Sequence, residues 1–303
     1  MPKVSVLMNC YNGEKYLREA IDSIVAQTFS DWEIVFIDNC SSDNSAQIAQ
    51  SYGEKLKYYR TNMNIPLGAA REWGMQFCKG DYIAFLDTDD VWLPLMLEKQ
   101  IEAIESNDYT LAYAGQIEID AYGNIVGEMI PSFKKGNIFR ELLLQYDIPI
   151  VSAMVNRQKL EDSRLNFDPS IFGSEEYCLF MQLAVDAKFI VIPEALVKYR
   201  VYKGSLTSKT MSKRAYERKY TLDKIIEAHP DIVKKFPREF SEAYARGAYH
   251  EAQYQMSENN HFMAFKTLSK YIFLDYRYFM LAFLTLMPKV FWDYVQTKKY
   301  KRK

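Results

Sequence analysis

The stretch "IAFLDTDDVW", residues 83–92, joins an apolar run to a cluster of carboxylates. Its first part has the composition of a buried β-strand. Asp87, Asp89 and Asp90 follow at once, and like charges this close repel one another unless a cation lies between them. The stretch therefore predicts a strand whose end carries a divalent cation, and a cation so placed usually holds a phosphate.

Strands and helices alternate ahead of this stretch. Short apolar runs predict strands at residues 4–8, 32–37, 56–59 and 81–86. Apolar residues at helical spacing, or capping residues, predict helices at residues 14–27, 43–52 and 67–78. The order β-α-β-α-β-α-β predicts an α/β fold with a doubly wound, mostly parallel sheet and helices on both faces.

Polar residues follow three of these strands. They are Cys10, Tyr11 and Asn12 after the first, Asp38 and Asn39 after the second, and the three aspartates after the fourth. Ligands of such sheets bind beyond the carboxyl ends of the strands. We therefore expect the three clusters to converge at one edge of the sheet.

The remaining sequence predicts further elements and a second region. A helix reaching residue 106 precedes strands at residues 110–119, 125–129 and 149–155, and helices at residues 139–144 and 175–187. From about residue 208 the chain is helical and rich in Lys, Arg and Tyr. We expect a catalytic domain over residues 1–207 and a smaller helical C-terminal region over residues 208–303.

Composition excludes some classes of function. The formal net charge of −1 over 303 residues disfavours nucleic acid as a partner. The four cysteines form no C-x-x-C pair, which argues against zinc, and the absence of a signal peptide predicts a cytoplasmic protein. Neither G-x-G-x-x-G after the first strand nor a P-loop is present, so side chains and a metal must hold any nucleotide.

A helix cap is a simpler explanation of the aspartate cluster than a metal site. Asp89 or Asp90 could cap the helix that begins near Leu93. A cap explains one aspartate and not three. Mg²⁺ and Mn²⁺ prefer hard oxygen ligands and often take only one or two carboxylates plus substrate phosphates, which favours the metal site.

Two longer strings, "VSVLMNCYNGEKYLREAIDSIVAQTFSDWEIVFIDNCSSDNS" and "GAAREWGMQFCKGDYIAFLDTDD", together resemble the family 2 glycosyltransferases of the GT-A fold. The resemblance covers the first 110 residues strongly and reaches residue 207 more loosely. It implies a nucleotide-sugar half over about 1–110 and an acceptor half over about 111–207. It also implies Mn²⁺ or Mg²⁺ as cofactor, with Asp89, helped by Asp87, as the metal ligand.

The resemblance also implies which residues bind the nucleotide sugar. Tyr11 would help to form the base pocket, Asn39 would contact the base, and Arg71 would lie close to the nucleotide, with Asp87 beside it. The family usually has proline where Asn9 stands, and we place Asn9 in the same group. The family usually has aspartate where Asn39 stands, and an amide can donate as well as accept, so the base stays open, with a UDP-sugar favoured.

Two later stretches extend the resemblance. "GSEEYCLFMQLA" matches the region in which the second of two acids is the general base of inverting members, which implies Glu176, or failing that Glu175, as the base. Both could instead stabilise a helix N-terminus. "YRVYKGSLT" matches the tract that closes the catalytic domain, where Arg200 could neutralise the diphosphate, and Tyr202 stands where the family often has a metal-binding His.

The C-terminal segment over residues 271–295 is rich in Phe, Leu, Met and Tyr, and the sequence ends in "KKYKRK". Its apolar runs are too short to span a bilayer. An interfacial helix with a basic anchor would allow peripheral contact with the inner face of a membrane. A core helix followed by a loose tail explains the same pattern.

The function expected is that of an inverting, metal-dependent glycosyltransferase. It would move a sugar to a hydroxyl of a glycan or lipid-linked acceptor, in the synthesis of bacterial surface polysaccharide. Two alternatives remain: a catalytically degenerate protein that binds nucleotide sugar without turnover, and a sugar nucleotidyltransferase. The single glycine of "NCYNGEKYL" disfavours the second, which normally carries a glycine-rich loop.

Overall fold

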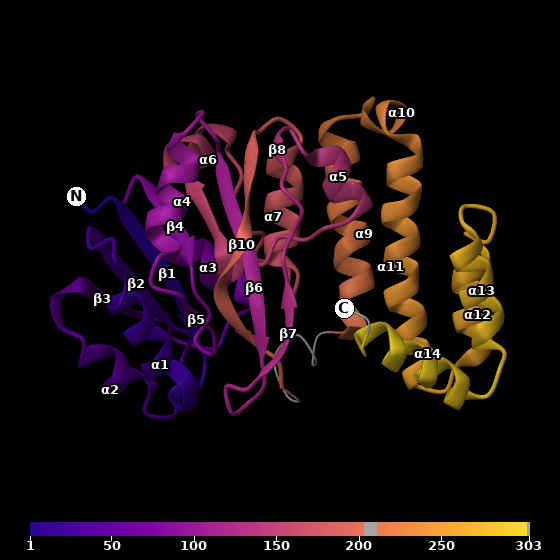
Figure 1. Cartoon of the computed structure of the whole chain (residues 1–303), viewed down its shortest axis with the longest axis horizontal. Helices are drawn as coiled ribbons and strands as arrows, with labels where there is room; N and C mark the ends of the chain where they lie inside the picture. Colours follow the sequence, from indigo (N-terminus) through magenta and orange to yellow (C-terminus); the bar gives the residue numbers. More distant parts are fainter. Residues whose placement is uncertain (203–210, 302–303) are drawn as a thin grey trace. The chain divides into compact units, whose positions relative to one another are not determined.

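The computed structural model describes residues 1–202 and 211–301, and the chain divides into two compact units (Figure 1). One unit comprises Met1–Ile138 and Asp147–Lys203 and contains the sheet. The other comprises Phe139–Tyr146 and Gly204–Lys303, and its described elements are all helices. The predicted helix at 139–144 therefore belongs to the second unit although it lies within the first in sequence.

Four parallel strands form one half of the sheet. In spatial order they are β3 (Leu56–Arg60), β2 (Trp32–Asp38), β1 (Val4–Cys10) and β4 (Tyr82–Phe85). The register pairs Cys10 with Asp38 and Asp38 with Arg60, so the last residues of these three strands lie side by side. This arrangement confirms the doubly wound order expected from the sequence.

The other half of the sheet is mixed. Continuing from β4, the order is β9 (Ala153–Asn156), β6 (Leu111–Ile119), β10 (Phe189–Arg200) and β5 (Val91–Trp92), with β7 (Ile125–Met129) on β6 and β8 (Lys135–Gly136) on β10. Only β6 and β10 are parallel within it.

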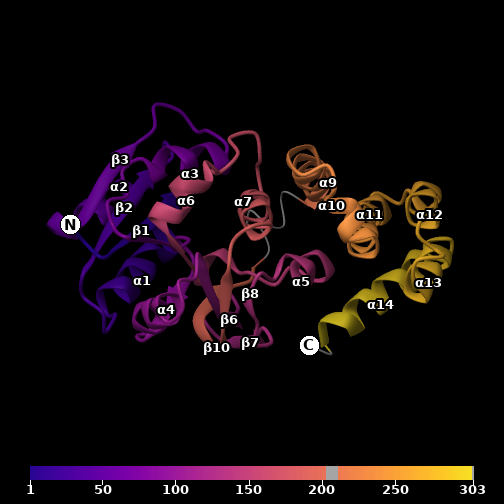
Figure 2. The same cartoon turned by 90° about the horizontal axis from the view of Figure 1, so that it is seen from above.

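Helices cover both faces of the sheet, as Figure 2 shows. Helices α1 (Glu14–Val25), α2 (Ser45–Gln50) and α4 (Met96–Glu105) pack on the face that carries Val4, Val6 and Met8. Helix α3 (Leu67–Met75) packs on the opposite face, where Gly74 lies against Leu7. Helix α7 (Glu175–Ala184) joins it there through Phe180, which contacts Phe85. A shorter helix, α6 (Arg157–Ser163), follows β9.

Two elements of the acceptor half differ from the expectation. The strand predicted at residues 149–155 is instead a 3-10 turn, Ile150–Ser152, followed by the short β9. Pro149 starts the turn, and its carbonyl accepts from the Ser152 N–H at 3.0 Å. Strand β10 was not predicted, because Pro193 interrupts its apolar pattern. The register of β10 shifts between Ile192 and Ala195, and a β-bulge accommodates a proline inside a strand.

The second unit confirms the expected helical C-terminal region. Its helices are α5 (Phe139–Leu144), α9 (Met211–Ala228), α10 (Ile232–Lys235), α11 (Pro237–Ser257), α12 (His261–Ser269), α13 (Tyr276–Thr285) and α14 (Lys289–Lys301). A core that includes Tyr249, Met256, Leu268 and Trp292 joins α11 to α14. Within residues 1–202 and 211–301, no helix has the length and apolar character needed to cross a membrane.

Candidate active site

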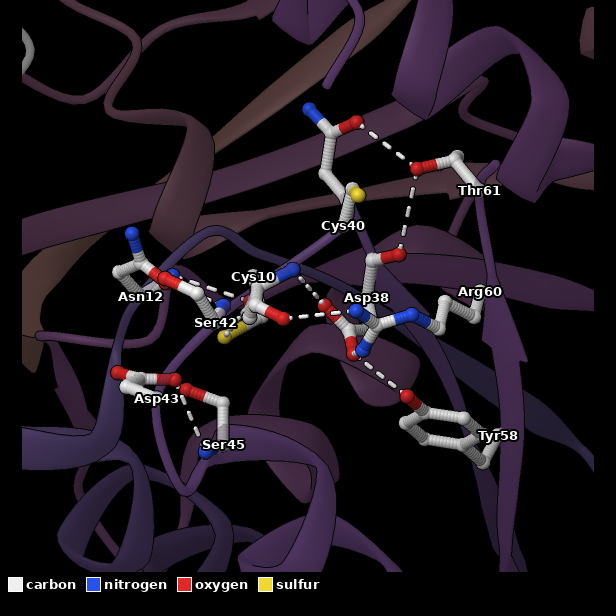
Figure 3. A network of polar contacts seen from close by, with 12 residues as sticks. Cys10, Asn12, Asp38, Cys40, Ser42, Asp43, Ser45, Tyr58, Arg60 and Thr61 are labelled. Atoms are coloured by element: carbon white, nitrogen blue, oxygen red, sulfur yellow. Dashed lines mark hydrogen bonds and ion pairs between the residues drawn. The ribbon is translucent and has the colours of Figure 1, made fainter. Parts of the chain in front are cut away.

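The loops that follow β1 and β2 are hydrogen-bonded to each other (Figure 3). The Asn39 N–H donates to the Cys10 carbonyl at 2.7 Å, and the Asn12 N–H donates to the Ser41 hydroxyl at 3.0 Å. The Asn12 side chain accepts from the Ser42 N–H at 2.8 Å. Two of the predicted polar clusters therefore form one rigid rim at the carboxyl edge of the sheet.

Asp38 lies at the centre of this rim and is fully buried (Figure 3). One carboxylate oxygen accepts from the Ser41 N–H at 2.7 Å. The other accepts from Arg60, at 2.6 Å, and from the Tyr58 hydroxyl. Because both oxygens are occupied, Asp38 fixes the loop. The sequence analysis did not identify Tyr58 and Arg60, because no local pattern in strand β3 indicates that these two side chains bind Asp38.

The Asn39 side chain is committed to the backbone of the loop after β3. Its Nδ2 donates to the Ile65 carbonyl at 2.8 Å, and its Oδ1 accepts from the Ile65 N–H at 3.0 Å and from Thr61 at 3.2 Å. An aspartate could make only the accepting half of this set. The amide thus fits the loop, and its predicted contact with a base stays a prediction.

Asn9 and Tyr11 lie beside the rim and differ in exposure. Both side-chain polar atoms of Asn9 are buried, and neither has a hydrogen-bond partner within the described part of the chain. An unpaired buried amide costs about 1–3 kcal/mol, which a ligand that pairs with it would recover. The Tyr11 ring is 56% exposed, so its face is open to a flat ligand.

The loop with Asp87 and Asp89 packs directly against the rim. A Cβ added to Gly13 would lie 2.9 Å from the Thr88 hydroxyl, so a larger residue here would have to displace the Thr88 side chain. Burial and the neighbouring Asp87 carboxylate raise the pKa of Asp89 to about 6, although Tyr202 donates a hydrogen bond to it. The third polar cluster therefore joins the other two, as expected.

Asp90 does not face the same surroundings as Asp87 and Asp89. It is buried, and one of its carboxylate oxygens accepts from the backbone N–H of Arg200 at 2.7 Å. Burial, with Asp89 and Asp87 nearby, raises the pKa of Asp90 well above its usual range. Asp90 thus fixes the loop to the end of β10 and does not cap helix α4, whose N-cap residue is Leu95.

Arg200 is enclosed by protein groups, although the sequence suggested that it could face a diphosphate. Its Nε donates to the Asp89 carbonyl at 2.8 Å, and a terminal nitrogen donates to Glu19 at 2.7 Å. Its guanidinium lies 4.2 Å from the centre of the Tyr16 ring. With the side chain only 2% exposed, Arg200 shapes the aspartate loop, and a direct contact with diphosphate stays a prediction.

Arg71 joins two parts of the site that are far apart in sequence. One terminal nitrogen pairs with Asp87 at 2.6 Å, and the other pairs with Glu175 at the start of α7. The guanidinium also lies 5.8 Å from the centre of the Phe167 ring. Helix α3 can hold Arg71 here because Gly68 packs against the Asp168 carbonyl, where a Cβ would clash at 2.2 Å. Arg71 therefore fixes the aspartate loop relative to the predicted base.

Replacing Arg71 with methionine should lower the free energy of unfolding by about 3–5 kcal/mol, because two acids lose their buried counter-charge. Urea denaturation followed by circular dichroism measures this change. Lys99→Met is the matched control, since Lys99 pairs with Glu194 on the surface, and it should change stability by less than about 1 kcal/mol. Equal effects of the two substitutions would contradict the structural role of Arg71.

The two predicted base residues have different surroundings. Glu175 is buried, and its Oε2 has no hydrogen-bond partner among the described residues. Burial raises the pKa of Glu175, while the neighbouring Arg71 opposes the shift and favours the charged carboxylate that it pairs with. Glu176, the next residue, is half-buried. The ion pair with Arg71 gives Glu175 a positioning role, which leaves Glu176 as the better candidate for the base.

The carboxylates at the end of β4 suit a divalent cation. Asp87 and Asp89 offer hard oxygen atoms. Burial, and after it repulsion by Asp87, raises the pKa of Asp89, and a cation would relieve both costs of the charge. In the described ranges, no three His, Cys, Asp or Glu side chains form a group that could hold a metal. Two carboxylates, with phosphate and water as further ligands, are a donor set that fits Mg²⁺ or Mn²⁺.

Comparison with known proteins identifies relatives of the chain. The family model described as "Glycosyl transferase family 2" matches residues 5–163. An uncharacterized glycosyltransferase of Methanocaldococcus jannaschii is 33% identical over 73% of this chain and 78% of its own length. The Escherichia coli UDP-Glc:alpha-D-GlcNAc-diphosphoundecaprenol beta-1,3-glucosyltransferase WfgD is 28% identical over 68% of this chain and 79% of its own length.

Solved structures share the fold. Staphylococcus aureus TarS 1-349 in complex with UDP-GlcNAc has a TM-score of 0.68 at 20% identity, over 92% of this chain and 83% of that one. The mannosyltransferase PcManGT of Pyrobaculum calidifontis, in complex with GDP-Man and Mn²⁺, has a TM-score of 0.64 at 14% identity, over 99% of this chain and 84% of that one. The shared fold is that of the GT-A glycosyltransferases.

Proposed function

Because the chain belongs to glycosyl transferase family 2 and is a glycosyltransferase that uses a nucleotide sugar, we propose that it transfers the sugar with inversion, with the help of Mn²⁺ or Mg²⁺. The acceptor is a hydroxyl of a glycan or lipid-linked glycan in the synthesis of bacterial surface polysaccharide. The observation that carries the proposal is the ion triple in which the buried Arg71 holds Asp87 and Glu175 together.

The related proteins support the choice of substrates. WfgD is named for UDP-Glc and for a diphosphoundecaprenol-linked acceptor, and TarS was solved with UDP-GlcNAc. These names favour a UDP-sugar as donor and a lipid-linked glycan as acceptor here. PcManGT was solved with GDP-Man and Mn²⁺, which supports a divalent cation and leaves a GDP-sugar as the alternative donor.

The donor would bind along the rim described above. The exposed Tyr11 ring would cover the base, and the unpaired amide of Asn9 would gain a hydrogen bond from the nucleotide. Asn39 and Arg200 would act through the loops that they hold, and Asp89 with Asp87 would hold the cation. When bound, a divalent cation supplies positive charge that stabilises the leaving nucleotide diphosphate.

Transfer requires a base on the acceptor side. The acceptor oxygen forms a bond to the anomeric carbon of the sugar as the bond from that carbon to the diphosphate oxygen breaks. The hydroxyl proton passes to the Glu176 carboxylate, and the diphosphate leaves with the electron pair of the broken bond. Attack on the face opposite the leaving group inverts the anomeric configuration. Glu175 would keep α7 in place through Arg71.

We assign the catalytic part to residues 1–207 and the helical region to residues 208–303. We further propose that the protein works at the cytoplasmic face of the membrane. A lipid-linked acceptor lies in a bilayer, so the transferase would have to work at a membrane surface. The absence of a spanning helix in the described ranges is compatible with peripheral contact.

A donor panel tests this function. The purified full-length protein is incubated with UDP- and GDP-sugars, an undecaprenyl-diphosphate glycan acceptor, and Mn²⁺, Mg²⁺ or EDTA. We expect nucleotide diphosphate release and glycosylated product with one UDP-sugar and a divalent cation, and NMR should show an inverted anomeric centre. Tight donor binding without hydrolysis or transfer across the whole panel would support the degenerate binding protein instead.

A further inference from the structure

Helix α13 is apolar on most of its circumference, with Arg277 as its one charged residue, but the described residues cover only one side of it. Tyr278 and Ala282 belong to the core of the second unit, and Thr285 is buried on the same side. On the other side, Phe279, Met280 and Phe283 fall within about 100° of the helix circumference and are exposed. A helix that is apolar on most of its circumference is normally buried on most of it, so this exposed side needs a partner.

The exposed apolar side chains continue beyond α13. Leu286 and Met287 follow in the turn, and Val290, Phe291, Tyr294 and Val295 follow on α14, all of them exposed. In contrast, Trp292 of α14 is buried in the core of the second unit. We call these six exposed residues, together with Phe279, Met280 and Phe283, but without Trp292, the α13–α14 face. Nine such side chains within seventeen residues exceed the scattered apolar residues of an ordinary surface.

The α13–α14 face thus has nine members in all: Phe279, Met280, Phe283, Leu286, Met287, Val290, Phe291, Tyr294 and Val295.

Positive charge is concentrated in the same part of the chain. Residues 261–303 contain nine Lys and Arg, two Asp and no Glu, whereas the whole chain has a formal net charge of −1. A second copy of this face would bring like charges together, which disfavours self-association. An anionic surface complements the charge.

We infer that the α13–α14 face docks the protein on the surface of an anionic lipid bilayer. Helix α13 has 10 residues and is about 15 Å long, half of what is needed to cross the hydrocarbon core, so it would lie in the plane of the interface. Its aromatic and Met side chains enter the acyl boundary while the neighbouring Lys and Arg meet the headgroups. The inference adds to the lipid-linked acceptor proposed above, because it would bring the enzyme to the bilayer that contains such a lipid.

Vesicle co-sedimentation of the full-length protein tests the inference. Vesicles contain phosphatidylcholine alone or phosphatidylcholine with about 30% phosphatidylglycerol, since anionic headgroups supply the charge attraction. We expect binding to the anionic vesicles at low salt, weaker binding at high salt, and little binding to phosphatidylcholine alone. The double variant Phe279→Glu/Phe283→Glu should bind the anionic vesicles at least about 10-fold more weakly, because it places charges in the acyl boundary.

The matched control is Tyr216→Glu/Tyr254→Glu, which adds the same charges at exposed tyrosines of α9 and α11 and should bind as the unchanged protein does. Equal melting curves by circular dichroism establish that each variant is folded.

Failure of the folded, unchanged protein to bind anionic vesicles would overturn the inference. So would a dimer, seen by light scattering, that Phe279→Glu/Phe283→Glu dissociates, because the face would then bind a second copy. The assay contains no nucleotide sugar, so its outcome is independent of the transfer assay.

Discussion

Asp89→Asn should abolish metal-dependent nucleotide binding and lower transfer by about 10³-fold or more, which corresponds to several kcal/mol of lost charge stabilisation. Burial and the neighbouring Asp87 raise the pKa of Asp89 to about 6. A nearby cation would therefore stabilise the charged form of Asp89. The substitution keeps the size of the side chain and its capacity to accept from Tyr202. The loss of nucleotide binding and of transfer would therefore measure the effect of the Asp89 charge.

Isothermal titration of Mn²⁺ and then of UDP or GDP measures the two binding steps without turnover. The unchanged protein should bind the nucleotide more tightly with Mn²⁺ than with EDTA, whereas Asp89→Asn should bind it equally weakly in both. Asp81→Asn is the control, because Asp81 precedes the other end of β4 and its side chain is 60% exposed. A variant at Asp89 that keeps the metal effect would remove the proposed cation site from this loop.

Glu176→Gln should leave donor binding unchanged and lower the rate of transfer by about 10²–10⁴-fold, because an amide cannot accept the acceptor proton. The measurements are the dissociation constant for the nucleotide, from titration, and the single-turnover rate of transfer. A loss in the rate alone distinguishes a base from a residue that binds the donor.

Glu175→Gln provides the comparison for this second prediction. It removes the charge that Arg71 pairs with, so its main effect should be a lower free energy of unfolding, which urea denaturation reports. If Glu176→Gln retains full turnover while a folded Glu175→Gln loses it, the base is Glu175 and the assignment of roles along α7 is reversed.

The parallel half of the sheet could be predicted because its signals are local. Each strand is a short apolar run, and each helix shows apolar residues at its own spacing, as with Leu17, Ile21 and Ile24 of α1, which are buried. The carboxyl ends of parallel strands meet at one edge, so the convergence of the three polar clusters followed from the order of elements alone. Strand β10 could not be predicted in the same way, since Pro193 breaks its pattern and its pairing partner β6 begins far earlier in the chain.

The same distinction between local signals and tertiary contacts applies to the single residues of the site. The sequence could select Arg71, Glu175 and Arg200, but it could not show what each one contacts. Arg71 reaches Glu175 across 104 positions, and Arg200 reaches Glu19 across 181. Such pairs are specified only by how the helices pack on the sheet. For this reason the sequence places Arg200 against a diphosphate, whereas in the structure Arg200 contacts Glu19, the Tyr16 ring, the Asp120 carbonyl and the backbone of the aspartate loop.

By itself, the sequence determined the alternation of strands and helices, the cluster of carboxylates after β4, and the family to which those strings are similar. These features depend on neighbours in the chain, where periodicity and charge can be read directly. Only the tertiary structure decided that Arg71 binds Asp87 and Glu175 at once, and that the described residues leave one side of α13 uncovered. Both facts depend on which surfaces meet after folding, and local sequence does not encode the partner of a buried charge or of an apolar face.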